Sequence, residues 1–167
     1  MNYLIILALI IILPFAYVLK FGAPYLPTKK QQINVAIDMI KLRKLKTVIE
    51  LGSGDGKVQK ALAKNKIKSI GYELNFILYL VSLVILWRHR KYAVVKCKNY
   101  WQANWPVADA IYLFLQPKFM DRIEKEILNY MTVNNIKSLY VYSFAFSINN
   151  WQELKHKDGI YEYIVEL

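Results

Sequence analysis

Three closely spaced glycines follow an acidic residue in the segment Glu50-Leu51-Gly52-Ser53-Gly54-Asp55-Gly56. The β-branched run Thr47–Leu51 is typical of a buried strand, and the residues from Lys57 onward are typical of a helix. Glycine has no side chain and adopts positive φ, so a ligand can approach such a loop closely. In parallel α/β sheets, ligands bind outside the carboxyl ends of the strands. The segment therefore predicts a ligand-binding loop, with a tight structural turn as the alternative.

The spacing of the glycines decides which ligand fits. A dinucleotide fingerprint needs glycine where Lys57 stands, and a Walker A loop needs Ser or Thr where Val58 stands. Glu50 suits a phosphate poorly, but it suits a cation such as the ammonium of an amino acid. Glu73, in Gly71-Tyr72-Glu73-Leu74-Asn75, can accept hydrogen bonds from both hydroxyls of a ribose. An amino-acid end and a ribose end together describe S-adenosylmethionine (SAM).

On these residues the chain resembles the class I SAM-dependent methyltransferases. The glycine loop and Gly71–Asn75 are similar to those of a narrower group, the small membrane-anchored lysine methyltransferases that modify the c-subunit of ATP synthase or the adenine nucleotide translocator. The resemblance covers roughly residues 25–151, together with the hydrophobic segment before them. It implies an α/β fold, with a Rossmann-like class I methyltransferase sheet that has helices on both faces and follows one transmembrane helix. It also implies SAM-dependent methylation of lysine.

The resemblance implies roles for individual residues. The cofactor-binding residues would be Glu50, Gly52, Ser53, Gly54, Asp55, Gly56, Glu73 and Asn99. Glu50 and the glycines would line the methionine portion, Glu73 the ribose and Asn99 the adenine amine. The family usually has an aspartate at the position of Asn99, before an aromatic pair that is Tyr100 and Trp101 in this chain. An amide carbonyl still accepts a hydrogen bond there, with less negative charge.

Residues after the next strand would position the substrate. Methyl transfer to nitrogen is an in-line displacement, so the protein mainly aligns a neutral amine and excludes water. Gln116 and Pro117 stand where amine-methylating relatives present a polar residue beside proline. Gln116 is the predicted acceptor for the amine, and capping of the next helix by Gln116-Pro117 is the alternative. One or two of four aromatic residues could wall a lysine channel, while most would be core: Tyr142, Phe144, Phe146 and Trp151.

Alternating hydrophobic patterns supply the elements that position these residues. The predicted strands are 47–51, 68–73, 93–97, 110–115, 138–146 and 159–167, and the predicted helices are 31–42, 57–65, 76–90 and 118–131. This alternation indicates a parallel sheet covered on both faces. Thr28 is the predicted N-cap of the first of these helices. The apolar run Phe76–Trp87, about 18 Å long as a helix, is too short to span a bilayer and is interpreted as a core helix.

An uncharged segment from Tyr3 to Leu19 precedes these elements. It is about 25 Å long as a helix, near the short limit for crossing a hydrocarbon core of about 30 Å. A cleaved signal peptide and a buried helix are the alternatives. Lys20, Lys29 and Lys30 follow the segment, and the positive-inside rule then predicts a single-pass membrane protein with a cytoplasmic catalytic domain. The expected organisation is an anchor over 1–20, a connector over 21–30 and a SAM-dependent methyltransferase domain over 31–167.

The length and composition of the chain limit the domains, binding partners and metals that we expect. A chain of 167 residues has room for one domain. The net charge of +11 suits anionic lipid, where each basic residue contributes roughly 1 kcal/mol, or a nucleic acid, which is not favoured. The basic segment Trp87–Lys91 is a candidate for contact with substrate or lipid. One cysteine, Cys97, and two histidines offer no familiar metal-ligand spacing, so we expect no metal.

Three functions remain in competition. Methylation of lysine on a membrane-associated protein leads, because a tether raises the effective concentration of partners on the same bilayer. The second is methylation of RNA or a small molecule, with the basic charge binding phosphate. The third is a SAM-binding module without activity, for which Asn99 is the only sign.

Overall fold

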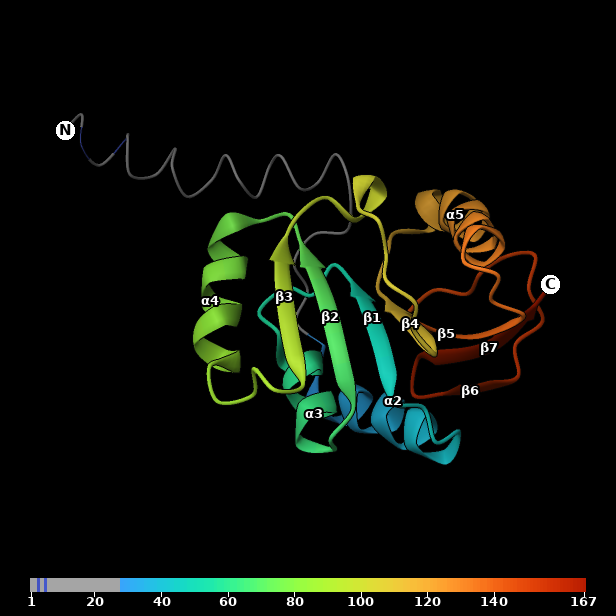
Figure 1. Cartoon of the computed structure of the whole chain (residues 1–167), viewed down its shortest axis with the longest axis horizontal. Helices are drawn as coiled ribbons and strands as arrows, with labels where there is room; N and C mark the ends of the chain where they lie inside the picture. The colour runs from blue at the N-terminus through green and yellow to red at the C-terminus, as the bar shows by residue number, and fades with distance from the viewer. Residues whose placement is uncertain (1–2, 4, 6–27) are drawn as a thin grey trace.

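A seven-stranded sheet forms the centre of the domain in this computed structural model (Figure 1). The structure describes Tyr3, Ile5 and residues 28–167. The strand order is β3-β2-β1-β4-β5-β7-β6. The strands are β1 (Thr47–Leu51), β2 (Lys68–Glu73), β3 (Ala93–Cys97), β4 (Ala110–Leu113), β5 (Ser138–Phe144), β6 (Lys155–Lys157) and β7 (Ile160–Glu166). The order reverses direction between β1 and β4, which is the kind of switch point where α/β sheets bind ligands.

Strands β1 to β5 are parallel, as predicted, but the sheet is mixed because β7 pairs antiparallel with both β5 and β6. The predicted parallel sheet therefore extends from β3 to β5, the predicted strand over 159–167 joins it in the antiparallel direction, and β6 was not predicted. The physical reason is local. Asp158 and Gly159 both have positive φ and form a tight turn, so the chain folds back on itself without a crossover helix. Strand β6 is exposed and polar, and its sequence lacks the apolar alternation from which a strand could have been predicted.

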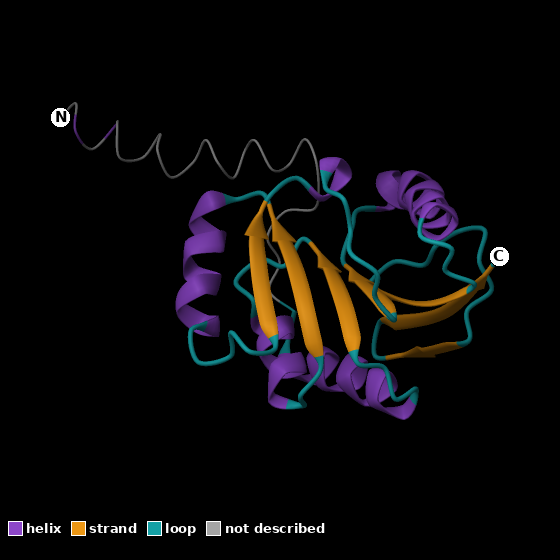
Figure 2. Cartoon of the chain, in the orientation of Figure 1, coloured by secondary structure: helices purple, strands orange, loops and turns teal. Residues whose placement is uncertain are grey.

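Helices cover both faces of the sheet, as predicted (Figure 2). Within residues 28–167 the helices are α2 (Lys30–Leu42), α3 (Lys57–Lys64), α4 (Phe76–Leu86) and α5 (Met120–Val133), with short 3-10 helices η1 (Tyr100–Gln102) and η2 (Pro117–Phe119). One apolar core joins α2 and α3 to the sheet through Ile37, Leu62 and Tyr112. A second joins α5 to the opposite face through Ile123 and Ile111. Because both faces are buried, the central strands β1 and β4 have mostly apolar sequences.

Several predicted element ends differ from the structure. Helix α2 begins after Lys29, which occupies the N-cap position without a side-chain hydrogen bond, so the prediction of Thr28 as the cap is wrong. Helix α4 ends at Leu86 rather than at Arg90. The two strands that were predicted to end at residues 115 and 146 end at Leu113 and Phe144. These differences leave the order of the elements unchanged and lengthen the loops at the carboxyl ends of the strands.

Helix α4 is a core helix on one side only. Leu78, Ser82 and Leu86 are buried at four-residue spacing, facing the sheet and α3. On its opposite side, Phe76 and Val84 are exposed. The interpretation of the run 76–87 as core is therefore wrong for the outward side, because the apolar sequence continues around the helix while the protein packs against only one side of it.

Within Tyr3, Ile5 and residues 28–167, no helix has both the length and the apolar character needed to cross a bilayer. The predicted transmembrane anchor over residues 1–20 lies outside the described residues, apart from Tyr3 and Ile5. Most of the predicted connector over 21–30 also lies outside them.

Candidate cofactor and substrate site

The predicted site residues lie along one edge of the sheet, where the parallel strands β1 to β5 end (Figure 1). We call it the carboxyl edge. The glycine loop follows β1, Glu73 ends β2, and Asn99 follows β3. Gln116 follows β4, and Phe144 ends β5. Residues from five separate parts of the chain are thereby brought to the same edge.

The glycine loop is fixed to the neighbouring strand by its backbone. The N–H groups of Gly52 and Ser53 both donate to the carbonyl oxygen of Tyr72, at 3.0 and 2.9 Å. Gly52 has φ +80°, and no atom lies within 4 Å of the position that a Cβ would take there. A residue with a side chain would be strained at this φ, and it would fill the open space beside the backbone. The loop therefore offers a ligand close access at Gly52.

Gly56, the last glycine of the loop, is surrounded by side chains, whereas Gly52 faces open space. Gly56 has φ +79°, precedes α3, and would bring a Cβ within 3.2 Å of the side chains of Ser82 and Leu86 in α4. Its lack of a side chain lets α4 approach the start of α3. The structure therefore places this predicted cofactor residue at a contact between helices.

Glu73 joins the glycine loop to the end of β2. Its Oε2 accepts a hydrogen bond from the N–H of Gly54 and its Oε1 accepts one from the N–H of Asn75, both at 2.7 Å. Burial raises the pKa of Glu73, and the backbone N–H groups oppose this rise. A carboxylate has about four acceptor positions, so these two hydrogen bonds leave Glu73 with capacity for a further donor. The arrangement fits a group that offers two neighbouring hydroxyls, such as a ribose.

Glu50 is a buried carboxyl group without a full set of partners. It is 3% exposed, and its Oε2 has no hydrogen-bond partner among the described residues. Burial, followed by the nearby carboxylates of Asp55 and Glu73, raises the pKa of Glu50 well above its ordinary value. Tyr112 lies opposite Glu50 on β4, and burial together with this carboxylate raises the pKa of Tyr112. An unpartnered buried carboxylate is costly, and a bound cation would relieve that cost.

The hydroxyl of Ser53 and the side-chain amide nitrogen of Asn75 also lack a partner within residues 28–167. Asn75 was not predicted as a site residue. Its side-chain oxygen accepts from the N–H groups of Ile77 and Leu78, and so it caps α4. An asparagine directly before an apolar run is an N-cap signal that could have located it.

Asp55 differs from the other two acidic residues because it has a cation beside it. Its Oδ2 lies 2.7 Å from the Nζ of Lys57, and its Oδ1 accepts from the backbone N–H of Lys57 at 3.3 Å. These contacts hold the end of the loop at the start of α3.

Asn99 caps the 3-10 helix η1. Its side-chain oxygen accepts from the N–H of Trp101 at 3.1 Å, which leaves one acceptor position of the amide oxygen for another donor. The Trp101 ring packs against Phe119, and the guanidinium of Arg122 lies 4.0 Å from its centroid. Because Asn and Asp are about equally good caps, the local structure tolerates asparagine where the family usually has aspartate.

The predicted substrate residues lie after β4. Gln116 occupies the N-cap position of η2 with Pro117 at its first position, and the Gln116 side chain makes no capping hydrogen bond. Phe114, which was predicted only as part of a strand, packs against Phe144 and Phe146 with ring centroids 4.8 and 6.4 Å apart. We call these three rings the aromatic cluster. A strand that ends two residues earlier than predicted turns Phe114 into a loop residue at the carboxyl edge.

Two of the four predicted aromatic residues belong to the core. Tyr142 is fully buried, and its hydroxyl donates to Glu162 Oε1 at 3.0 Å. Glu162 also binds the guanidinium of Arg43, with a closest distance of 3.1 Å. Trp151 packs edge-on against Tyr163, with ring centroids 5.9 Å apart. These contacts leave Phe144 and Phe146 as the predicted aromatic residues that pack with Phe114 near the end of β4.

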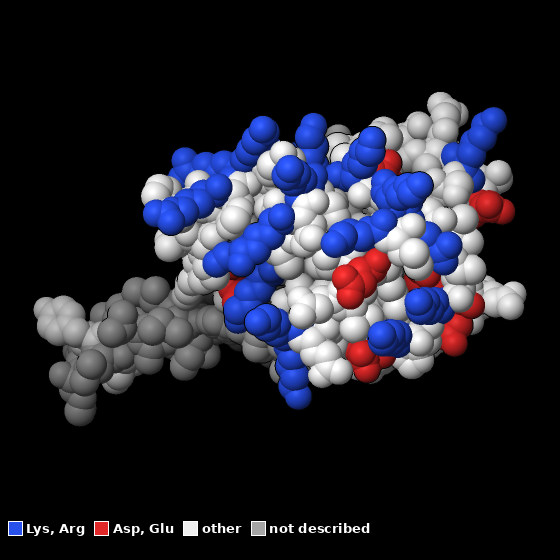
Figure 3. Space-filling model, turned by 90° about the horizontal axis from the view of Figure 1, so that it is seen from below, with Lys and Arg blue, Asp and Glu red and all other residues white. Residues whose placement is uncertain are grey.

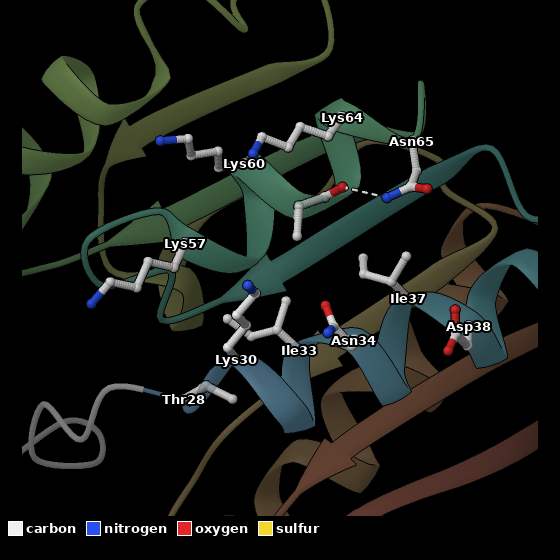
Figure 4. A pocket seen from close by; sticks show the side chains of 11 residues that line it. Thr28, Lys30, Ile33, Asn34, Ile37, Asp38, Lys57, Lys60, Lys64 and Asn65 are labelled. Atoms are coloured by element: carbon white, nitrogen blue, oxygen red, sulfur yellow. Dashed lines mark hydrogen bonds between the residues drawn. The ribbon is translucent and has the colours of Figure 1, made fainter.

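A separate groove of about 710 Å³ lies between α2 and α3 (Figure 4). It does not include Glu50, Glu73 or Asn99. Its charged side chains are those of Lys30, Asp38, Lys57, Lys60 and Lys64. This excess of positive charge opposes both the sulfonium of SAM and a protonated lysine. The groove is therefore unsuited to methyl transfer between these two cations.

Comparison with known proteins gives consistent matches. The family model described as the ANTKMT methyltransferase domain matches residues 50–155. The human lysine N-methyltransferase of the ATP synthase c-subunit is 28% identical over 110 residues, which are 65% of this chain and 47% of that protein. The Xenopus laevis protein of the same name is 29% identical over 113 residues, covering 65% and 48%. The chain thus spans about half the length of these relatives.

Solved structures show the same fold. An RNA methyltransferase from Salinibacter ruber in complex with S-adenosyl-L-homocysteine has a TM-score of 0.71 and 17% identity, covering 84% of this chain and 93% of that chain. The 23S rRNA methyltransferase ErmE has a TM-score of 0.58 and 19% identity, covering 72% and 48%.

Proposed function

Because the chain belongs to the ANTKMT methyltransferase domain family and is a SAM-dependent methyltransferase, we propose that it methylates the amine of lysine on a membrane-associated protein. The main support for lysine as the acceptor comes from the residues at the carboxyl edge. There the uncharged amide of Gln116 follows β4, close in sequence to Phe114 of the aromatic cluster. The names of the curated relatives, which are lysine N-methyltransferases, support the same acceptor.

SAM supplies an electrophilic methyl group on its sulfonium when it is bound. The unpartnered Glu50 carboxylate would hold the ammonium of its methionine portion, and Glu73 would accept from its ribose hydroxyls. Asn99 would accept from the adenine amine. The open space beside Gly52 admits the backbone-like part of such a ligand. The unsatisfied groups of the loop therefore fit SAM in charge and in hydrogen-bonding capacity.

The substrate side must provide a neutral amine, because an ammonium has no lone pair with which to attack. Apolar and aromatic surroundings disfavour the charged form of an amine and lower its pKa. The aromatic cluster would contact the methylene chain of the lysine and exclude water from it. The carbonyl of Gln116 would accept one N–H of the amine and direct its lone pair toward the methyl group. Positioning and desolvation would then supply most of the rate enhancement.

We further propose that the uncharged segment Tyr3–Leu19 anchors the chain in a membrane. Lys20, Lys29 and Lys30 follow the segment, which supports a cytoplasmic position for the domain. A tether of this kind raises the effective concentration of the enzyme toward proteins on the same bilayer.

The proposal is tested by incubating the full chain, reconstituted in membranes that lack it, with SAM tritiated at the methyl group. We expect a discrete labelled protein that contains methyl-lysine by mass spectrometry. Gln116→Leu removes the acceptor at similar size and should lower kcat while leaving SAM affinity unchanged. Gln31→Leu, an exposed glutamine on α2, is the matched control and should change neither.

The other two functions are outcomes of the same experiment. The net charge of +11 favours RNA as the second candidate substrate. Label that is lost on treatment with ribonuclease, and not with protease, would establish RNA methylation instead. SAM binding by calorimetry with no label in any fraction would establish a module without activity on these substrates.

A further inference from the structure

The outward side of α4 is an exposed apolar surface. Its outward residues are Phe76, Leu80, Val81, Leu83 and Val84, and Trp87 directly follows the helix. Val84 is 72% exposed and Trp87 is 56% exposed. The helix contains no charged residue, and one of its few polar side chains, Ser82, is buried on the opposite side. We call this surface the α4 face.

A helix on the surface of a water-soluble domain normally presents polar residues to the solvent. At about 100° per residue, Phe76, Leu80, Val84 and Trp87 fall within an arc of about 80° around the helix axis. An apolar arc that continues along the full length of a helix marks a contact surface rather than scattered exposed side chains. Among the described residues, nothing covers the α4 face.

Charge complementarity indicates which partner covers it. Arg88, Arg90 and Lys91 follow the helix directly and are exposed, and no acidic residue occurs between Asn75 and Lys98. A view from the amino ends of the parallel strands, toward which α4 runs, shows Lys and Arg spread widely and Asp and Glu sparsely (Figure 3). An apolar helix surface with Trp and Phe, next to a basic cluster, is the composition that binds an anionic membrane interface. A second copy would bring the same basic cluster against itself.

We propose that the α4 face lies on the surface of an anionic bilayer. Phe76, Leu80, Val84 and Trp87 enter the boundary between headgroups and acyl chains, and the basic cluster contacts the lipid phosphates. At about 16 Å the helix is too short to span the membrane, and it therefore lies in the plane of the interface. The inference rests on the membrane location in the proposed function, but it does not depend on the methylated residue.

This contact would orient the site. Helix α4 begins directly after Glu73 and Asn75, so its Phe76 end is at the carboxyl edge and its Trp87 end is at the opposite edge of the sheet (Figure 1). With α4 in the interface, the carboxyl edge opens sideways, next to the lipid headgroups. Substrate lysines close to the membrane surface would then be the ones within reach.

The test measures lipid contact at Val84 against a matched position. Val133 is also a valine in an α-helix, is 70% exposed, and lies on the other sheet face. Val84→Cys and Val133→Cys are made separately in the full chain with Cys97→Ser, and each is labelled with an environment-sensitive fluorophore. The protein is reconstituted in vesicles of phosphatidylcholine and phosphatidylglycerol that carry a lipid-bound quencher. We expect blue-shifted emission and several-fold stronger quenching at 84 than at 133.

Equal quenching at the two positions would overturn the proposal. Protection of position 84 from aqueous iodide without quenching by lipid would also overturn it, because the cover would then be protein. Replacing Arg88, Arg90 and Lys91 with glutamine should reduce quenching at 84 in anionic vesicles and not in phosphatidylcholine vesicles. An equal reduction in both would contradict the role given to charge. Tritium labelling of substrate is scored separately, so failure of this inference and failure of the proposed function can be told apart.

Discussion

Replacing Glu50 with glutamine should stabilise the ligand-free protein. The Glu50 carboxyl is almost fully buried, and its Oε2 has no partner within residues 28–167. The amide has the same shape and carries no charge that must be desolvated. We expect Glu50→Gln to raise the free energy of unfolding by about 1–3 kcal/mol at neutral pH, because folding of the wild-type chain must either bury an uncompensated charge or take up a proton, and the neutral amide avoids both. Each kcal/mol corresponds to about 2–4 °C in Tm for a chain of this size.

The pH dependence provides an independent check. Burial and two neighbouring carboxylates raise the pKa of Glu50 in the folded state, so above pH about 4.3 the folded protein holds a proton that the unfolded chain has lost. Stability contributed by this group therefore falls as pH rises from the unfolded pKa toward the folded pKa. The variant lacks this decline. Thermal unfolding in mild detergent should show a Tm difference near zero at pH 4 that grows toward neutral pH.

The same substitution should weaken SAM binding, because the carboxylate is the proposed partner of the ligand's ammonium. A hydrogen bond to a charged group contributes about 1.5–3 kcal/mol, which is about a ten- to hundredfold change in Kd by calorimetry. Glu166→Gln, at an exposed position of β7, is the control and should change neither property. A ligand-free variant that is less stable than the wild type, or one that binds SAM with unchanged affinity, would refute the role given to Glu50.

Three further predictions concern neighbouring residues. Glu73→Gln should act in the opposite direction from Glu50→Gln and lower the Tm without SAM, because one amide oxygen cannot serve two separate backbone N–H groups, a loss of about 1–3 kcal/mol. Asn99→Asp should keep the cap of η1 and tighten SAM binding several-fold by calorimetry. Tyr142→Phe should lower the free energy of unfolding by about 1–2 kcal/mol in denaturant titrations, with SAM affinity unchanged, because Glu162 loses a buried donor.

The part of the site that could be predicted from the sequence rests on local signals. The glycine loop follows the strand β1 and Glu73 ends the strand β2, and strands that alternate with helices bring their carboxyl ends to one edge. The convergence of Asn99 and Gln116 on that edge followed from the same rule. The structure also shows that the glycine loop and Glu73 are joined by a hydrogen bond from the N–H of Gly54 to the Glu73 carboxylate. No sequence pattern predicts this bond.

The features that were missed depend on contacts between distant residues. Phe114 becomes part of the aromatic cluster only because β4 ends at Leu113 and leaves its ring against Phe144. The antiparallel strand β7 depends on a turn with two positive-φ residues and on an exposed partner strand without apolar alternation. The apolar periodicity of a sequence predicts which side of an element is buried, but it does not predict which other element packs against that side.

Helix α4 shows this limit most clearly. An apolar run of this length reads as core, and its inner side is core, with Ser82 and Leu86 packed against the position of Gly56 in the glycine loop. The outer side has the same chemistry and no cover among the described residues. A helix that contacts the glycine loop on one side and lipid on the other would hold the loop at a fixed angle to the bilayer. The proposed lipid contact would account for the apolar sequence of the outer side, and it would restrain rotation about the proposed anchor.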